Sequence, residues 1–233
     1  MEAAPIVLLI IVVIGLFIAI AVYAHKKEKE REAALAAWAM ENGWSYRKEK
    51  ERGFDSFYKG FKQLRQGSNR YAHNIIQGEF EGRGLTTFDY HYETHSTDSK
   101  GNRQTHHHRF SAIILGTTLP LKPLFIRPEG FFDKMAGAFG FDDIDFESAE
   151  FSRKFHVSSP DRKWAYDVLH ARAIEYIMDL PKKYTIGFDR DHVFICEGQR
   201  RWKPPEFVPA VRVVDTLLDM LPEYVKQQQR EQA

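Results

Sequence analysis

A long apolar run without a single charge constrains this chain more than any other feature. It extends from Ala3 to Ala24 and reads AAPIVLLIIVVIGLFIAIAVYA. About 20 apolar residues in a helix span the roughly 30 Å hydrocarbon core of a bilayer. A helix also satisfies its own backbone hydrogen bonds there, which an isolated strand cannot do. We therefore predict a transmembrane anchor over residues 1–25.

A cleaved signal peptide is the competing interpretation, because Val22 and Ala24 match the small residues of a cleavage site. The anchor is favoured, since Glu2 and no lysine or arginine precede the run, which is also longer than the usual apolar core of a signal peptide. Lysine and arginine concentrate on the cytoplasmic side of a membrane. They follow the run at Lys26, Lys27, Lys29 and Arg31. The predicted protein is therefore single-pass, with its N-terminus outside and its C-terminal domain in the cytoplasm.

The rest of the chain divides into three parts. Residues 26–42 are predicted to form a juxtamembrane helix or stalk, with Asn42-Gly43 as its C-cap. Residues 43–226 are predicted to be a soluble α+β domain, and residues 227–233 a disordered tail. Short alternating runs broken by glycine turns indicate a mainly antiparallel sheet. An apolar stripe from Phe207 to Leu221 indicates a C-terminal amphipathic helix packed on that sheet. A small pleckstrin-homology-like barrel is the architecture suggested by analogy.

One predicted hairpin joins residues 85–92 to residues 110–115 across a long polar loop. If Gly101-Asn102 forms its turn, Phe88 lies opposite Leu115, so that apolar side chains meet on one face. The same register places His95 opposite His108.

Histidines in this hairpin are the candidate metal ligands. In the register above, His106 lies two residues from His108 on the same face. Cross-strand Cβ atoms are about 5 Å apart, a span that zinc can bridge with imidazole nitrogens. His95, His106 and His108 are therefore the candidate zinc ligands. Glu93 is a candidate fourth ligand, whereas His107 is expected to point the other way. The alternative is an exposed polar hairpin tip that is rich in histidine without binding metal.

Residues 56–78 contain basic and aromatic side chains but no acid. The basic members are Lys59, Lys62, Arg65 and Arg70. Below a cytoplasmic leaflet, each basic residue near anionic headgroups contributes about 1 kcal/mol of attraction. These four residues are therefore the candidate membrane-surface contacts. Nucleic acid is disfavoured as a partner, because the formal net charge is only +1. The alternative is a loop whose aromatics join the core while its lysines stay solvated.

Three stretches of the chain resemble an uncharacterised family of bacterial single-pass membrane-anchored proteins. They are NGWSY (42–46), NIIQGEFEGRGLTTFDYHY (74–92) and the segment from Arg127 to Leu169. The resemblance implies a bacterial origin, hence the inner membrane, and a shared fold. It implies no activity, because none is established for that family, and no site residue follows from it.

Two functional hypotheses follow. The first is a non-enzymatic, membrane-anchored binding or scaffold module that contacts a protein partner or anionic lipid headgroups and needs no cofactor. The sequence contains no G-x-S-x-G, Walker A or HExxH motif, and its single cysteine, Cys196, lies in an apolar strand-like run. The second is a membrane-tethered metal-dependent hydrolase that uses the hairpin histidines, with carboxylates from residues 142–150. The oligomeric state and the partner are not predicted.

Overall fold

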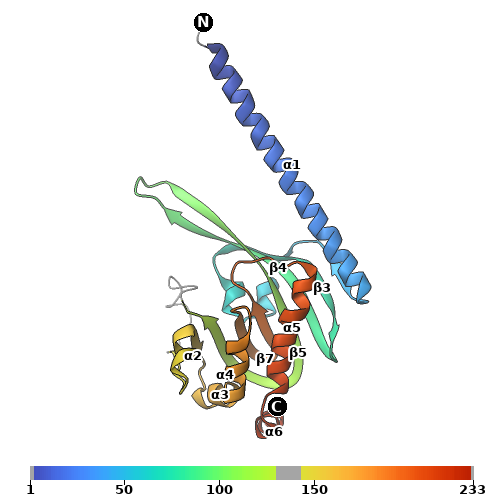
Figure 1. Ribbon diagram of the computed structural model, residues 1–233, viewed down its shortest axis with the longest axis vertical. Coiled ribbons are helices and arrows are strands. Elements are labelled where there is room, and N and C mark those ends of the chain that lie inside the picture. The colour runs from blue at the N-terminus through green and yellow to red at the C-terminus, as the bar shows by residue number, and fades with distance from the viewer. Residues whose placement is uncertain (1–2, 130–142, 232–233) are drawn as a thin grey trace.

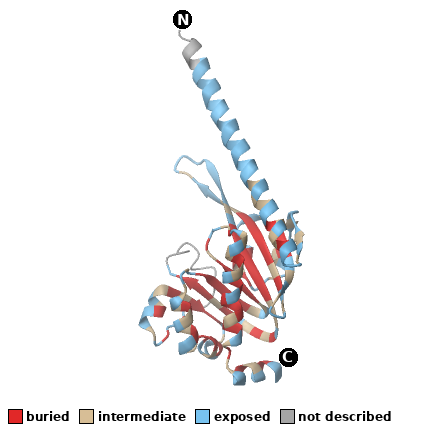
Figure 2. Ribbon diagram, turned by 45° about the vertical axis from the view of Figure 1, so that its right-hand side comes forward, coloured by how far each residue is buried: buried red, intermediate tan, exposed pale blue. Residues whose placement is uncertain are grey.

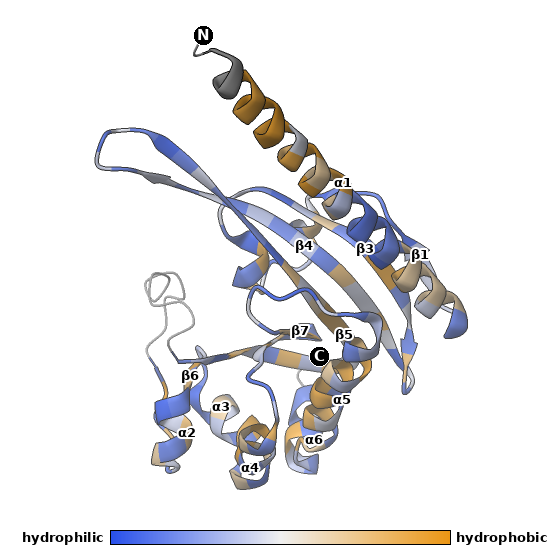
Figure 3. Ribbon diagram, turned by 45° about the horizontal axis from the view of Figure 1, so that its top comes forward, coloured by the Kyte–Doolittle hydropathy of each residue, from blue (hydrophilic) through white to orange (hydrophobic). Residues whose placement is uncertain are grey.

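The computed structural model describes residues 3–129 and 143–231. Helix α1 (Ala3–Glu41) is a single unbroken helix, so the membrane segment and the predicted stalk are continuous. Its apolar half projects away from the rest of the protein (Figures 1 and 3). Large side chains such as Leu8 and Phe17 are exposed there. Among the described residues, α1 is the helix long and apolar enough to cross a membrane.

The domain is built on one antiparallel sheet. Its strands follow the order β1-β3-β4-β5-β6, with β2 also paired to β3 and β7 to β5. The strands are β1 (Ser45–Arg47), β2 (Glu51–Arg52), β3 (Ser68–Phe80), β4 (Arg83–Thr97), β5 (Arg103–Pro128), β6 (Phe155–Ser158) and β7 (Thr185–Cys196). The α+β prediction is confirmed, but the barrel analogy is wrong because the sheet is open. Helices α1 and α5, in place of further strands, cover the face that a barrel would enclose.

The remaining helices lie in the second half of the chain, among and after the last strands of the sheet. They are α2 (Ala149–Lys154), α3 (Arg162–Val168), α4 (Ala171–Asp179), α5 (Pro204–Asp219) and α6 (Glu223–Glu231). The predicted amphipathic helix is confirmed as α5, which buries Phe207, Val211 and Val214 against β5 and β7. The prediction of a disordered tail is wrong for residues 227–231. They belong to α6, because Val225 and Gln229, one turn apart, are both buried on its inner face.

Each face of the sheet carries its own core. The buried residues lie mainly along the strands and on the helices packed against them (Figure 2). Adjacent β5 residues alternate between the two, with Ile113 in one core and Ile114 in the other. The first core contains Leu35 and Ala39 of α1 together with α5. The second is covered by residues 54–65, which include the short 3-10 helices η1 (Phe54–Ser56) and η2 (Lys62–Arg65). The base of α1 is thus part of the domain's core.

Tryptophan side chains connect α1 to the sheet and to α5. The Trp38 ring stacks on Phe207 at 5.3 Å between centroids and meets Trp44 edge-on at 5.0 Å. Trp44 lies over Gly78 of β3, where a Cβ atom would come within 2.0 Å of the indole ring. Only glycine leaves room for Trp44 at this position.

Candidate functional site

A buried ion pair joins helix α1 to the sheet. The Arg31 guanidinium of α1 donates from Nε to Asp89 Oδ2 at 3.0 Å and from Nη2 to Asp89 Oδ1 at 2.7 Å. Asp89 lies in the middle of β4, with its side chain 1% exposed. A carboxylate buried to this degree requires charge and hydrogen-bond partners, and a bidentate arginine supplies both.

Polar side chains from two neighbouring strands complete the coordination of Asp89. Ser111 Oγ donates to Oδ1 at 2.5 Å, and Asn74 Nδ2 donates to Oδ2 at 3.1 Å. Arg31 also donates to the carbonyl oxygen of Trp202, which precedes α5. Burial alone would raise the pKa of Asp89, but the hydrogen bonds and charge of Arg31, aided by Ser111 and Asn74, outweigh it and hold that pKa below its usual value. The carboxylate therefore stays ionised at neutral pH.

A second ion pair lies one helical turn closer to the apolar half of α1. Arg201 donates from both terminal nitrogens to the Glu28 carboxylate at 2.9 Å. The hydrogen bond from Arg201 lowers the pKa of Glu28 despite partial burial. Glu28 and Arg31 share one side of α1, so both pairs fix the rotation of the helix about its axis against the sheet.

Sequence reasoning missed this junction. It used Arg31 only as a cytoplasmic charge and assigned no role to Asp89. One signal was available, namely an acidic residue between the aromatic residues Phe88 and Tyr90 in the strand-like run LTTFDYHY. An acid in a buried strand needs a cation, and such a cation has to come from another element.

A groove of about 1330 Å³ opens beside the junction, between α1 and the sheet. On the helix side it is lined by Tyr23, Lys27 and Glu30, and on the sheet side by Lys50 and Arg109 among others. Tyr23 is the aromatic residue at the end of the apolar run. The groove therefore begins where the apolar half of α1 ends.

The predicted register of the β4–β5 hairpin is wrong by three residues. Phe88 pairs with Ala112 instead of Leu115, and His95 pairs with Thr105 instead of His108. The turn is centred on Lys100, because Asp98 closes it: its carboxylate accepts hydrogen bonds from the backbone of Lys100 and Asn102, both at 2.8 Å. A shift by an odd number of residues turns one strand's side chains to the opposite face.

The corrected register separates the three histidines predicted as ligands. His95 lies on one face, where Ser68 and Thr105 contact its ring nitrogens. His106 and His108 lie on the other face, beside Ser96 and Thr94 respectively. The structure therefore does not bring His95 together with His106 and His108.

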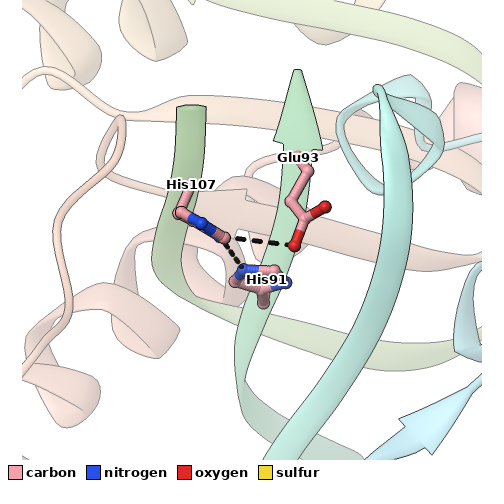
Figure 4. A group of neighbouring side chains, drawn as sticks. All are labelled: His91, Glu93 and His107. Atoms are coloured by element: carbon pink, nitrogen blue, oxygen red, sulfur yellow. Dashed lines mark hydrogen bonds and ion pairs between the residues drawn. The ribbon is translucent and has the colours of Figure 1, made fainter. Parts of the chain in front are cut away.

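A different set of side chains converges instead (Figure 4). His91 and Glu93 of β4 and His107 of β5 each place one potential ligand atom within 4.8 Å of the others. His107 Nδ1 lies 3.3 Å from both His91 Nε2 and Glu93 Oε1. Burial lowers the pKa of His91, and a hydrogen bond from Asn69 lowers the pKa of Glu93. At neutral pH these shifts favour the neutral imidazole of His91 and the ionised carboxylate of Glu93, and both forms have a lone pair that can bind a metal ion.

The predicted membrane-surface residues lie on the segment that covers the second core. Lys59 and Arg65 are exposed, whereas Lys62 and Arg70 are half-buried. Arg70 donates to the Gly67 carbonyl and lies 3.3 Å from the Asp55 carboxylate. Phe54 and Phe61 pack into the core, while Phe57 is exposed. This segment covers the face of the sheet opposite the one that holds α1.

No family model matches the chain, and no curated protein matches it. Among solved structures it is similar to the crystal structure of the mycobacterial trehalose monomycolate transport factor A, TtfA, with a TM-score of 0.55. The two chains are 13% identical, and the match covers 82% of this chain and 96% of that one. At this identity the likeness concerns the fold alone.

Proposed function

We propose that this protein is a non-enzymatic binding module, anchored in the inner membrane by α1, that presents its domain to a membrane-embedded protein partner on the cytoplasmic side. The observation that carries the proposal is the junction itself. The helix that holds the apolar segment enters the domain without a break, and Arg31 and Glu28 bond it to the sheet. A protein that only needed to remain near the membrane would be served by a flexible linker.

Retention of the anchor is supported by the continuity of α1. The helix passes through Val22 and Ala24, the residues that would match a signal-peptide cleavage site, and continues to Glu41. The cytoplasmic placement rests on Lys26, Lys27 and Lys29, which follow the apolar run directly. Bacterial origin, and with it the inner membrane, rests on the family resemblance.

The structural neighbour fits an accessory role at a membrane. That protein is named as a transport factor, and it shares the fold over most of both chains. We infer that this chain also assists a membrane process without carrying out its chemistry. The groove beside α1 is the proposed contact surface, since a membrane-embedded partner that lay alongside the helix would reach it first.

Site-specific cross-linking tests the proposal. A photoreactive amino acid replaces Lys50 or Arg109 in the groove, and Glu175 on α4 serves as the exposed control position. We expect a discrete cross-linked membrane protein from the groove positions, and none from position 175. Cross-links from all three positions alike, or none from the groove, would contradict the proposal.

Anionic headgroups are the second candidate ligand, through Lys59, Lys62, Arg65 and Arg70. The favouring observation is that Lys59 and Arg65 are exposed and enter no ion pair recorded among the described residues. Hydrogen exchange of residues 54–70 is measured for the full-length protein in nanodiscs with and without anionic lipid. Protection that requires anionic lipid and is lost in the Lys59→Gln/Arg65→Gln variant would support headgroup contact. Identical exchange in both lipids would exclude it.

A further inference from the structure

We propose that His91, Glu93 and His107 form a binding site for a divalent transition metal ion, with Zn²⁺ as the ion that best matches two imidazoles and one carboxylate. The site borders the groove proposed above as the partner surface, since Tyr71 and Arg109 of the groove lie beside His91, but none of its three ligands lines that groove. It lies on the β4–β5 hairpin, which extends beyond the body of the domain (Figures 1 and 4).

The spacing of the ligand atoms fits a tetrahedral ion. Zinc binds imidazole nitrogen at about 2.0–2.1 Å, and two ligands of a tetrahedron with such bonds are roughly 3.3–3.5 Å apart. His107 Nδ1 lies 3.3 Å from His91 Nε2 and 3.3 Å from Glu93 Oε1. Both separations are longer than the usual hydrogen-bond distance of about 2.7–3.2 Å. The third separation, between His91 and Glu93, falls within the 4.8 Å limit of the group.

The hydrogen bonds of His91 determine which nitrogen is free. Its Nδ1 lies 3.2 Å from the carbonyl oxygen of Asn69, which can only accept, so Nδ1 carries the hydrogen. In the neutral ring, Nε2 therefore presents a lone pair toward His107 and Glu93. Glu93 contributes carboxylate lone pairs to the same point. Convergent lone pairs require a hydrogen-bond donor or a cation among them, which is either the N–H of His107 Nδ1 or a metal ion.

Hydrogen bonds with a neighbouring residue fix the orientation of His91 and Glu93, as they do for the ligands of known metal sites. A metal-bound histidine almost always donates its second ring N–H to a carbonyl or carboxylate, which fixes the ring. Asn69 provides that carbonyl for His91, and its side chain donates to Glu93 Oε1 at 2.6 Å. Asn69 adopts a positive φ of 48°, a conformation that is uncommon outside glycine. Tyr71 stacks on the His91 ring at 4.6 Å. One residue of β3 thus orients two of the three ligands.

The site is closed on one side and open on the other. His91 is 3% exposed, whereas the His107 side chain is 55% exposed. An ion can therefore enter from the side of His107. Three protein ligands leave one tetrahedral position for water or for a donor from another molecule. Since His91 and Glu93 come from β4 and His107 from β5, a bound ion would also join the two strands of the hairpin.

Metal titration of the untagged full-length protein in detergent tests the site. We expect one Zn²⁺ per chain by calorimetry, and Co²⁺ absorption bands of a tetrahedral N/O site. His107→Ala and Glu93→Gln should each weaken Zn²⁺ binding by on the order of tenfold or more. Because His107 is exposed, His107→Ala remains informative even if His91→Ala does not fold. Asn69→Gly, which tolerates the positive φ, should weaken binding without unfolding the protein, since it removes only the amide that orients Glu93.

The matched controls are the other histidines of the hairpin. His95→Ala, His106→Ala and His108→Ala should leave the Zn²⁺ affinity within about twofold of the parent, because none of them belongs to the converging group. Absence of stoichiometric binding would overturn the proposal. The convergence of His107 and Glu93 would then be explained by a hydrogen bond between them alone. An equal loss of affinity in the control variants would overturn it as well, because the ion would then bind the histidine-rich tip without a defined site.

Discussion

Arg31 of α1 binds both carboxylate oxygens of Asp89, which lies in the middle of β4. The Nη2–Oδ1 distance is 2.7 Å, and the carboxylate is held further by Ser111 and Asn74. Removing two charges from water costs free energy that offsets their attraction, so a buried pair adds little net stability. Its effect is to favour the one arrangement in which both charges are paired. Here it selects one orientation of α1 on the sheet.

Asp89→Asn should destabilise the protein strongly. Loss of one partner leaves a buried charge without compensation, which typically costs about 3–5 kcal/mol. Denaturant unfolding of the full-length protein in detergent, followed by tryptophan fluorescence, measures the change in unfolding free energy. Glu30→Gln is the control, since the Lys26–Glu30 pair is exposed and 4.0 Å apart, and should cost roughly 0–1 kcal/mol. Equal effects of the two substitutions would show that the buried pair has no special weight.

The contribution of Asp89 should depend on pH in a defined direction. Its folded-state pKa lies below its unfolded-state value of about 3.9, so ionisation stabilises the fold fully above that value. As the pH falls below about 4 toward the folded-state pKa, the stabilisation is lost. Unfolding free energies of the parent and of Asp89→Asn between about pH 3 and 7 should therefore converge at the acid end. A constant difference across this range would contradict the assignment.

Gly78→Ala should loosen the contact between α1 and the sheet. An added Cβ would meet the Trp44 ring at 2.0 Å, so the indole would have to leave its position against Trp38. We expect a shifted tryptophan emission maximum and a loss of roughly 1–3 kcal/mol of stability from overpacking. Gly84→Ala, in the neighbouring strand, has nothing within 4 Å of the new methyl group and should show neither change.

Cys196 should not react with thiol reagents in the folded protein. Burial raises the pKa of its thiol, and the side chain is only 3% exposed, so neither thiolate nor access is available at neutral pH. Maleimide labelling should proceed only after denaturation. A cysteine introduced by Lys100→Cys at the exposed hairpin turn is the positive control. Rapid labelling of the parent protein under native conditions would disprove the burial.

Val225→Ala should measure how firmly α6 is docked. Full burial of a valine side chain contributes about 1.5–3 kcal/mol relative to exposure, and truncation to alanine removes part of that contribution. We expect a loss of about 1–2 kcal/mol in the same unfolding assay. Gln228→Ala, on the exposed side of α6, should be neutral. If both variants were as stable as the parent protein, the docking of α6 would contribute nothing to the stability of the fold.

Local patterns predicted those elements whose signal is contained within one segment. The apolar run of α1 and the apolar stripe of α5 are of this kind, because each can be read from the spacing of residues within one helix.

The register of β4 and β5 could not be read in the same way. Residues from Phe110 to Leu115 are buried without interruption, because each face of this sheet has its own core. Alternation disappears in such a strand, so an apolar pairing exists in either register. The side chain of Asp98 decided between them by closing the turn. Once the register was wrong, the histidines were assigned to the wrong faces and the convergence of His91, Glu93 and His107 was missed.

The unbroken passage of α1 into the domain has a mechanical consequence. Transmembrane helices tilt to match their hydrophobic length to the thickness of the bilayer. In α1 no flexible joint separates the apolar segment from the sheet. Leu35 and Ala39 of the helix are packed in the core, and Arg31 and Glu28 are bonded to Asp89 and Arg201 respectively. Any change in tilt is therefore passed on as an equal angular displacement of the whole domain. The β4–β5 hairpin points to the side from which the apolar half of α1 leaves the domain (Figure 1), so its tip moves with the domain relative to the membrane surface.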